Sequence, residues 1–434
     1  MTVLAFVIGV VLLVVGLAVS IALHEVGHLV PAKLFGVRVG RYMIGLGPTL
    51  WSRRYGETEY GVKALPVGGY ISMSGMYPPA PDEPDAAVRR SGRFFGAMVQ
   101  DARLANAETL VENDTRPAFY QLSVWKRIVI MVGGPFMNLV LAMVLFAIAL
   151  SAIGIPSVSP TIAAVNECVI PTGADRTACE AGDPVSPAAA GGIRPGDVIV
   201  AVDGTDVSGY AEATAIIQAS PGRTIPIVVE RDGDRVTLEV TPIAAERPIV
   251  NADGITEVKE VGFVGMTGTR VNVPQPIWSG PQQAVERLGA VAGVIWQLPV
   301  KVYQTGVALV TGGERDPNGP LSVVGAGRIA GEVAATEAPV QDRVVDLLGL
   351  LGSLNIALFI FNLLPLLPLD GGHVVVALWD GIKRVWAKLF RRPAPRPVDA
   401  TKLVPVTFVV VIGLIVMGGT LILADVFNPI SILG

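Results

Sequence analysis

Four stretches of this chain are apolar over the length of a membrane span. The first covers residues 2–30 and has no charged residue before Glu25. The others cover residues 125–155, 345–375 and 404–434. Because about 20 apolar residues in a helix cross a bilayer, the pattern predicts a polytopic α-helical membrane protein with about four transmembrane helices. A cleaved signal peptide fits the first stretch poorly, since no basic residues precede it.

The segment between the first two spans, residues 31–124, reads as two parts. Residues 41–73 alternate in polarity between glycines and prolines, which predicts a β-hairpin associated with the membrane. Residues 77–116 are polar and rich in proline, which predicts a flexible insertion. The run RRSGRFF inside it fits either a short basic amphipathic helix on the membrane or an ordinary solvated charge run.

The segment between the second and third spans has two parts with different predicted secondary structure. Residues 157–270 are rich in β-branched residues and turns, and predict an α+β domain with a helix at AEATAIIQAS and a hairpin turning at Asp232–Gly233. Residues 271–344 contain apolar runs that charged residues interrupt, which predicts amphipathic helices lying on the outer membrane surface. NGPLSVVG, at residues 318–325, is expected to form a turn.

Basic residues predict the orientation of the spans. Lys33, Arg38 and Arg41 follow the first span and nothing basic precedes it. The segment at residues 376–403 is also strongly basic and is expected to be a cytoplasmic loop. The positive-inside rule therefore places residues 31–124 and 376–403 in the cytoplasm, and the β-rich domain and both termini on the outer side.

Composition narrows the function classes. Hydrophobic residues make up 51% of the 434 residues and charged ones 16%, against about 25% in soluble domains. A net charge of −4 gives no reason to expect a nucleic-acid partner. The two cysteines, Cys168 and Cys179, both fall in the domain expected outside. They could close a disulfide there, or remain two thiols.

The candidate chemistry begins with HEVGH near the end of the first span. His24 and His28 are four residues apart and share one face of a helix, so both imidazoles can bind one metal ion. Glu25 between them can act as the general base for a water molecule. A pair of histidines in a soluble core helix is the plain alternative. The charge-free residues ahead of the motif instead indicate a metal site at the cytoplasmic end of a membrane span.

A catalytic zinc site needs a third protein ligand. Asp370 is the best candidate, because FNLLPLLPLDGGH ends the third span on the same side as HEVGH. A carboxylate and a hydroxide would also neutralise Zn²⁺ in the membrane. His373 could compete as a ligand or cap a helix. Asn362 could donate a hydrogen bond to the substrate, and could equally be a helix cap.

The hairpin has a functional interpretation beside the ordinary structural one. The peptide bonds of a helix are hydrogen-bonded to the helix itself, so a protease needs its substrate extended. An exposed strand next to the metal could pair with the substrate, which makes Gly68, Gly69 and Tyr70 candidate substrate-binding residues. GGPFMN in the second span could bring helices close together and supply a buried polar group, or reflect helix packing alone.

Several of these motifs together resemble known families. The run VSPAAAGGIRPGDVIVAVDGTDV resembles the core of a PDZ domain, which binds extended segments by strand addition. HEVGH, GGPFMN, the PDZ-like insert, NGPLSVVG and NLLPLLPLDGG occur in the order seen in the bacterial site-2 protease family. The resemblance covers nearly the whole chain. Leu367 stands where that family often has proline, and the insertion with the cysteines is not general in it.

The resemblance implies an intramembrane zinc metalloprotease of the bacterial inner membrane, acting in regulated intramembrane proteolysis. His24, His28 and Asp370 would bind Zn²⁺, Glu25 would be the base, and the hairpin at residues 59–73 would contact the substrate. Substrates would be single-span proteins such as anti-sigma factors, cut first by an upstream site-1 protease. Remnant signal peptides are a second substrate class. The PDZ domain would act as a size filter or substrate sensor.

Two other kinds of protein, a scaffold and a transporter, are alternatives to an enzyme. A PDZ scaffold with a structural zinc would need four protein ligands, which three histidines and distant cysteines supply poorly. A metal transporter would need polar residues along several spans, whereas the polar groups here cluster at one end.

Overall fold

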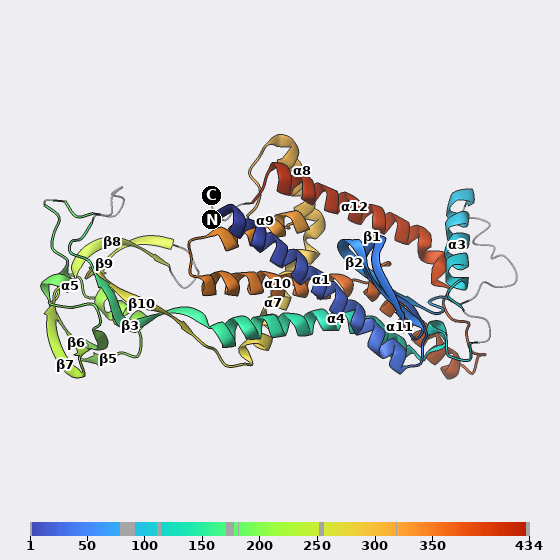
Figure 1. The fold of residues 1–434 in the computed structure, drawn as a ribbon, viewed down its shortest axis with the longest axis horizontal. Helices are drawn as coiled ribbons and strands as arrows, with labels where there is room; N and C mark the ends of the chain where they lie inside the picture. The colour runs from blue at the N-terminus through green and yellow to red at the C-terminus, as the bar shows by residue number, and fades with distance from the viewer. Residues whose placement is uncertain are drawn as a thin grey trace. The chain divides into compact units, whose positions relative to one another are not determined.

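The computed structural model describes residues 2–78, 92–110, 114–170, 178–180, 182–250, 256–317 and 319–430. The chain divides into two compact units, Gly154–Pro274 and the remainder. Figure 1 shows the larger unit as a group of long helices beside a twisted β-hairpin. Its first elements are α1 (Thr2–Leu34), β1 (Val39–Tyr55), β2 (Thr58–Met73), α3 (Gly92–Ala107), the 3₁₀ turn Phe119–Gln121, α4 (Val124–Ala147) and the π-helical turn Ile148–Ile153.

The larger unit resumes after the inserted unit. Its remaining elements are α7 (Ser279–Trp296), α8 (Leu298–Thr311), α9 (Val323–Ala335), α10 (Val340–Asn362), α11 (Asp370–Leu389), the 3₁₀ turn Ala400–Leu403 and α12 (Val404–Phe427). Among the described residues, four helices are long and apolar enough to cross a membrane: Val3–Leu34, Val124–Ile153, Val340–Asn362 and Ala400–Phe427. The prediction of four such helices is therefore confirmed.

Two glycines set how closely α1 and α4 pack. A Cβ atom on Gly27 would lie 2.2 Å from the carbonyl oxygen of Gly133, so neither position has room for a side chain. Earlier on the same helix, Ser20 is fully buried and accepts a hydrogen bond of 3.0 Å from Asn355 on α10. Small residues and buried polar pairs of this kind hold helices together in lipid, where the hydrophobic effect gives no net attraction.

The strands β1 and β2 fold back on each other more than a simple hairpin does. Residues 41–44 face residues 59–62 on one side and residues 69–72 on the other, while residues 49–55 pair with residues 58–63. Tyr42 anchors the sheet to α1 by donating a 2.8 Å hydrogen bond to the carbonyl oxygen of Ala22. Burial raises the pKa of Tyr42 to about 12, so the hydroxyl keeps its proton at neutral pH.

One of the helices predicted in residues 271–344 packs against the first span. The helix α9 packs along the first half of α1, where a Cβ on Gly9 would lie 2.3 Å from the carbonyl oxygen of Ala330. The expected turn at residues 318–325 ends early, because Ser322 caps α9 through its hydroxyl and the helix starts at Val323. Residue 318 lies outside the described residues. The helix α9 thus packs against a predicted span, and its place relative to the membrane surface stays a prediction.

The third apolar stretch is a broken helix rather than a span followed by a loop. The helix α10 ends at Asn362, and after a turn containing Pro365 and Pro368 a new helix, α11, runs from Asp370 to Leu389. The basic loop expected at residues 376–403 is thus half helical. A buried ion pair of 2.9 Å between Arg127 and Asp380 fastens α11 to α4.

The insertion expected to be flexible contains α3. Arg103 on that helix is buried and pairs with Asp399 at 2.7 Å, and Asn106 exchanges hydrogen bonds with the backbone of Tyr77. Arg103 thus holds α3 against the residues before α12, and Asn106 holds it against the segment that follows β2. The prolines and basic residues at 79–91 lie outside the described residues.

The smaller unit is the β-rich domain predicted for residues 157–270. It contains β3 (Ile155–Val165), α5 (Pro187–Ala190), β4 (Val198–Val202), β5 (Thr205–Asp206), α6 (Tyr210–Gln218), β6 (Ile225–Arg231), β7 (Asp234–Val240), β8 (Ile243–Val250), β9 (Thr256–Phe263) and β10 (Met266–Val273). The main sheet has the order β10-β3-β4-β6-β7, with β5 beside β4. As predicted, β6 and β7 turn at Asp232–Gly233, and both residues have positive φ. Cys168 and Cys179 form a disulfide.

Candidate metal centre

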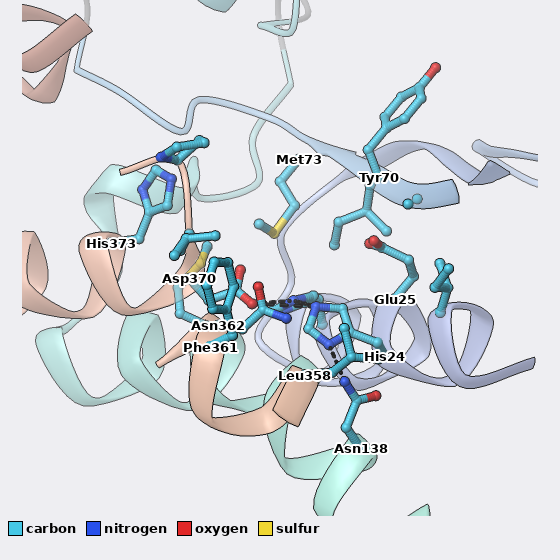
Figure 2. A pocket seen from close by; sticks show the side chains of 18 of the residues that line it. His24, Glu25, Tyr70, Met73, Asn138, Leu358, Phe361, Asn362, Asp370 and His373 are labelled. Atoms are coloured by element: carbon cyan, nitrogen blue, oxygen red, sulfur yellow. Dashed lines mark hydrogen bonds and ion pairs between the residues drawn. The ribbon is translucent and has the colours of Figure 1, made fainter. Parts of the chain in front are cut away.

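Three side chains from two distant parts of the chain converge in the larger unit. His24, His28 and Asp370 form the one group of three potential metal ligands in the described part of the chain, with all ligand atoms within 4.8 Å of one another. Asp370 Oδ2 lies 3.3 Å from His24 Nε2 and 3.4 Å from His28 Nε2. The two Nε2 atoms are 3.1 Å apart. Figure 2 shows His24 and Asp370 approaching each other from separate helices.

Helix geometry explains the convergence. The histidines are one turn apart on α1, so their rings lie on the same face. The break after α10 places Asp370 at the first position of α11, where the free backbone N–H groups and the helix dipole favour a carboxylate. The ring of His28 also fits closely against α4, because a Cβ on Gly134 would lie 2.1 Å from His28 Nε2.

The donor atoms fit a metal cation. Nδ1 of His28 lies 2.8 Å from the carbonyl oxygen of Ile130, which can only accept, so the proton is on Nδ1 and Nε2 presents a lone pair. Asp370 Oδ2 is buried and receives no hydrogen bond from any described residue. Lone pairs that face one another repel, and a bound cation removes that repulsion. Ligands of a tetrahedral Zn²⁺ at about 2.1 Å lie about 3.4 Å apart, close to the observed separations.

The histidines of the metal-ligand group lie well inside the helix that carries them. His24 is ten residues before the end of α1, which is about 15 Å along a helix. It faces Asn138, near the middle of the apolar stretch Val124–Ile153. The helix α1 continues to Leu34, four residues beyond the predicted end of the span at Val30.

A cavity of about 560 Å³ opens onto these side chains. Glu25, 7% exposed, lines it with its carboxylate on the side of β2, as Figure 2 shows. A Cβ on Gly69 would lie 3.1 Å from Glu25 Oε1, so the strand passes directly over the glutamate. Every residue singled out for substrate contact lines the cavity: Gly68, Gly69, Tyr70 and Asn362.

Two of the residues considered in the sequence lie away from the convergent atoms. His373 lines the cavity one turn beyond Asp370, but its ring stands beside Tyr77, with ring centroids 6.2 Å apart. It is not in the three-residue group. The ring of Tyr70 points away from the histidines in Figure 2. Asn362 is the last residue of α10, beside Asp370.

Some residues that line the cavity could not be predicted from the sequence. Leu17, Val323 and Leu358 come from α1, α9 and α10 and are ordinary apolar residues in the sequence. Nothing in their local pattern distinguishes them from residues facing lipid. For α9 a signal did exist, because Gly327 and Gly331 repeat at the four-residue spacing of close helix contacts.

Histidines and a carboxylate around a cavity, set among apolar helices, define a metallohydrolase of the membrane. A model of peptidase family M50 matches residues 12–392. The chain is 37% identical over 442 residues to the zinc metalloprotease Rip1 of Mycobacterium tuberculosis, covering 98% of this chain and 99% of that protein. It is also 28% identical to the metalloprotease MmpA of Caulobacter vibrioides, covering 88% of each.

The chain belongs to peptidase family M50, the site-2 protease family, and is a zinc metalloprotease. The family assignment made from the motifs is confirmed.

Proposed function

We propose that this protein is an intramembrane endopeptidase that cuts single-span membrane proteins with a zinc ion held by His24, His28 and Asp370. The observation that carries this proposal is the convergence of one potential ligand atom from each of these three side chains, all within 4.8 Å of one another. Three protein ligands leave one coordination position open, which distinguishes a catalytic zinc site from a closed structural one.

Held by His24, His28 and Asp370, a zinc ion would supply Lewis acidity that lowers the pKa of a water molecule and polarises the scissile carbonyl group. Glu25 is the general base: its carboxylate takes a proton from the attacking water and passes it to the leaving amine. Its buried position between α1 and β2 keeps bulk water away from this proton transfer.

Residues 69–72 of β2 are proposed to hold the substrate. One edge of this segment pairs with residues 41–44 of β1. A substrate strand adding beside Gly68, Gly69 and Tyr70 would be extended, which exposes the peptide bond that a helix protects. Asn362 lies at the cavity wall, where its amide can donate a hydrogen bond to the substrate backbone.

The smaller unit is proposed to be a PDZ-like domain that senses the substrate or limits its size. Its support is the five-strand path with the short helices α5 and α6, and the AGGIRPGD run before β4. The basic residues after α1 and on α11 favour a cytoplasmic location for those ends, with both termini and the PDZ-like unit outside. The proposed membrane is the bacterial inner membrane.

Single-span substrates would be anti-sigma factors whose outer domain an upstream site-1 protease has removed. Remnant signal peptides are the alternative class. Both are short apolar helices with little outside the membrane, which suits a cavity reached within the bilayer.

The test is zinc content and cleavage of a model single-span substrate by purified protein in detergent. Wild type should hold about one zinc ion and cut. Glu25→Gln should hold zinc and not cut, and Asp370→Ala should lose zinc. Glu286→Gln, an exposed change on α7, is the matched control and should behave as wild type.

Cleavage by Glu25→Gln at the rate of wild type would overturn the assignment of the base. Full zinc content in Asp370→Ala would overturn the ligand set. Chelation of zinc should abolish cleavage, and added Zn²⁺ should restore it.

A further inference from the structure

Asn138 is a polar residue in the middle of α4 that the proposed mechanism does not use. It is 1% exposed; its Nδ2 lies 3.4 Å from His24 Nδ1, and its Oδ1 is buried without a hydrogen bond from any described residue. Burying an amide within a membrane helix is costly, so such a residue needs a reason. Figure 2 shows Asn138 reaching from α4 to the far side of the His24 ring, away from Asp370.

The other histidine, His28, shows what a partner on α4 can do for an imidazole ring. His28 Nδ1 faces a backbone carbonyl oxygen of α4, that of Ile130, at 2.8 Å. A carbonyl oxygen accepts and cannot donate, so it fixes the proton on Nδ1 and leaves Nε2 free to bind metal. Ile130 and Asn138 are eight residues apart on α4, just over two helical turns. The helix therefore contacts both histidines on the side opposite the metal.

His24 also needs its proton on Nδ1 to bind metal through Nε2. A neutral imidazole has one proton, and metal binding through Nε2 requires that proton on Nδ1, where it must find an acceptor. The structure places Nδ2 of Asn138 toward His24, and a 180° turn of the carboxamide, whose two ends have the same shape, brings the unpaired Oδ1 there instead. With Oδ1 toward His24, Asn138 accepts the Nδ1 proton. With Nδ2 there, it would favour the tautomer that cannot bind metal through Nε2.

We propose that Asn138 is a positioning residue for the zinc site: its side-chain oxygen accepts the Nδ1 proton of His24 and holds the ring in its metal-binding tautomer and orientation. The inference rests on the proposed zinc ligands. It goes beyond the ligand assignment, because α4 supplies no ligand and would still set the tautomer of both histidines. Partners of this kind raise the basicity of a histidine ligand, and their loss costs roughly 10- to 100-fold in metal affinity.

Helix packing is the competing explanation for Asn138. Asn355 provides the matched control, since it is a fully buried asparagine whose amide bonds Ser20 on α1, one turn before His24, without contacting either histidine. A general disturbance of the α1 interface should follow from either substitution. A tautomer effect should follow from Asn138 alone.

The experiment measures zinc affinity by chelator competition with full-length metal-free protein in detergent. The variants are Asn138→Asp, Asn138→Leu and Asn355→Leu. Leucine has nearly the shape of asparagine without the acceptor, and aspartate restores the acceptor. Asn138→Leu should bind zinc roughly 10- to 100-fold more weakly than wild type. Asn138→Asp should stay within a few-fold of wild type, and Asn355→Leu should bind zinc like wild type.

Wild-type zinc affinity in Asn138→Leu would overturn the proposal, as would equal losses in all three variants. Thermal unfolding separates folding from binding. Metal-free Asn138→Leu should unfold no earlier than wild type, while its rise in Tm on adding zinc should shrink. If His24→Ala also kept full zinc affinity, the zinc site itself would be wrong, which is a different result from failure at Asn138.

Discussion

Gly27 and Gly133 are in direct backbone contact where α1 crosses α4. A Cβ on Gly27 would lie 2.2 Å from the carbonyl oxygen of Gly133, and a Cβ on Gly133 would lie 2.1 Å from that of Gly27. Gly27 is adjacent to His28. The distance between the two helices at this point therefore also sets where the His28 ring meets α4.

Replacing Gly27 with alanine should push α1 away from α4 and weaken the zinc site. Overpacking of this kind costs about 1–3 kcal/mol, and moving His28 should lower the zinc content as well. Thermal unfolding and metal analysis of the purified variant measure both effects. Gly418→Ala on α12 is the control, because a Cβ there would have no atom within 4 Å and alanine favours a helix by up to about 1 kcal/mol. Equal stability of the two variants would contradict the prediction.

Gly69→Ala should reduce cleavage without removing zinc. The new methyl group would lie 3.0 Å from Glu25 Cγ and 3.1 Å from Oε1, which displaces the proposed base. A misplacement near 1 Å can cost on the order of 100-fold in rate, so we expect a loss of ten- to a hundredfold in kcat. Gly40→Ala in β1 should cut normally, since the nearest atom is 3.9 Å from its Cβ position. Normal kcat in Gly69→Ala would show that the strand tolerates the change and Glu25 stays in place.

Asp425 and Arg315 form a buried pair whose loss should destabilise the protein. Asp425 Oδ1 accepts from Arg315 at 2.6 Å, and Oδ2 accepts from the backbone of Ser322 at 2.7 Å at the start of α9. Leaving one buried charge without its partner costs about 3–5 kcal/mol. Asp425→Asn should therefore lower Tm more than the double change Arg315→Met with Asp425→Leu. If the losses in Tm caused by Arg315→Met alone and Asp425→Leu alone simply added up in the double variant, this coupling would be contradicted. Glu314→Gln, beside Arg315 but exposed, is the control.

The smaller unit should lose stability in acid through Asp197. The guanidinium of Arg231, 2.7 Å away, holds the pKa of this buried carboxyl below its usual range. A lowered pKa in the folded state stabilises the fold above the ordinary aspartate pKa of about 3.9. That contribution disappears as the pH falls through the lowered value.

Hydrogen exchange of β4 and β6 in the full-length metal-free protein measures this effect. Wild type should keep its protection from pH 7 to about pH 5 and lose it at lower pH. Asp197→Asn should be less protected at neutral pH, by about 2 kcal/mol, the scale of hydrogen bonds to a charged group. It should also change less with acid. The same pH profile in both proteins would rule out Asp197 as the source.

Periodicity and composition predicted those parts of the fold that depend on local sequence. The spans around α1, α4, α10 and α12 follow from apolar length, and the turn at Asp232–Gly233 follows from residues that accept positive φ. HEVGH predicted the pairing of His24 with His28 because spacing on a helix fixes their shared face. Asp370 required a topological argument, since only the return of the chain through the membrane brings it near.

The remaining features depend on contacts between distant segments. The sequence of α9 is apolar with small residues, and only its packing on α1 separates it from a surface helix. The position of HEVGH within its helix depended on where α1 ends, and α1 continues through Pro31 to Leu34. The role inferred for Asn138 could not be read from GGPFMN, because nothing local shows that its side chain meets an imidazole.

The break between α10 and α11 has a consequence for how the protein is made. The ribosome delivers HEVGH early, and the nascent chain then carries the base and two of the three proposed ligands through most of translation. Asp370 arrives only after the smaller unit and α7 to α10 have been synthesised. A chain stalled or truncated before α11 would lack one of the three proposed ligands. The order of the ligands along the chain therefore delays a complete proposed zinc site until most of the protein has been synthesised.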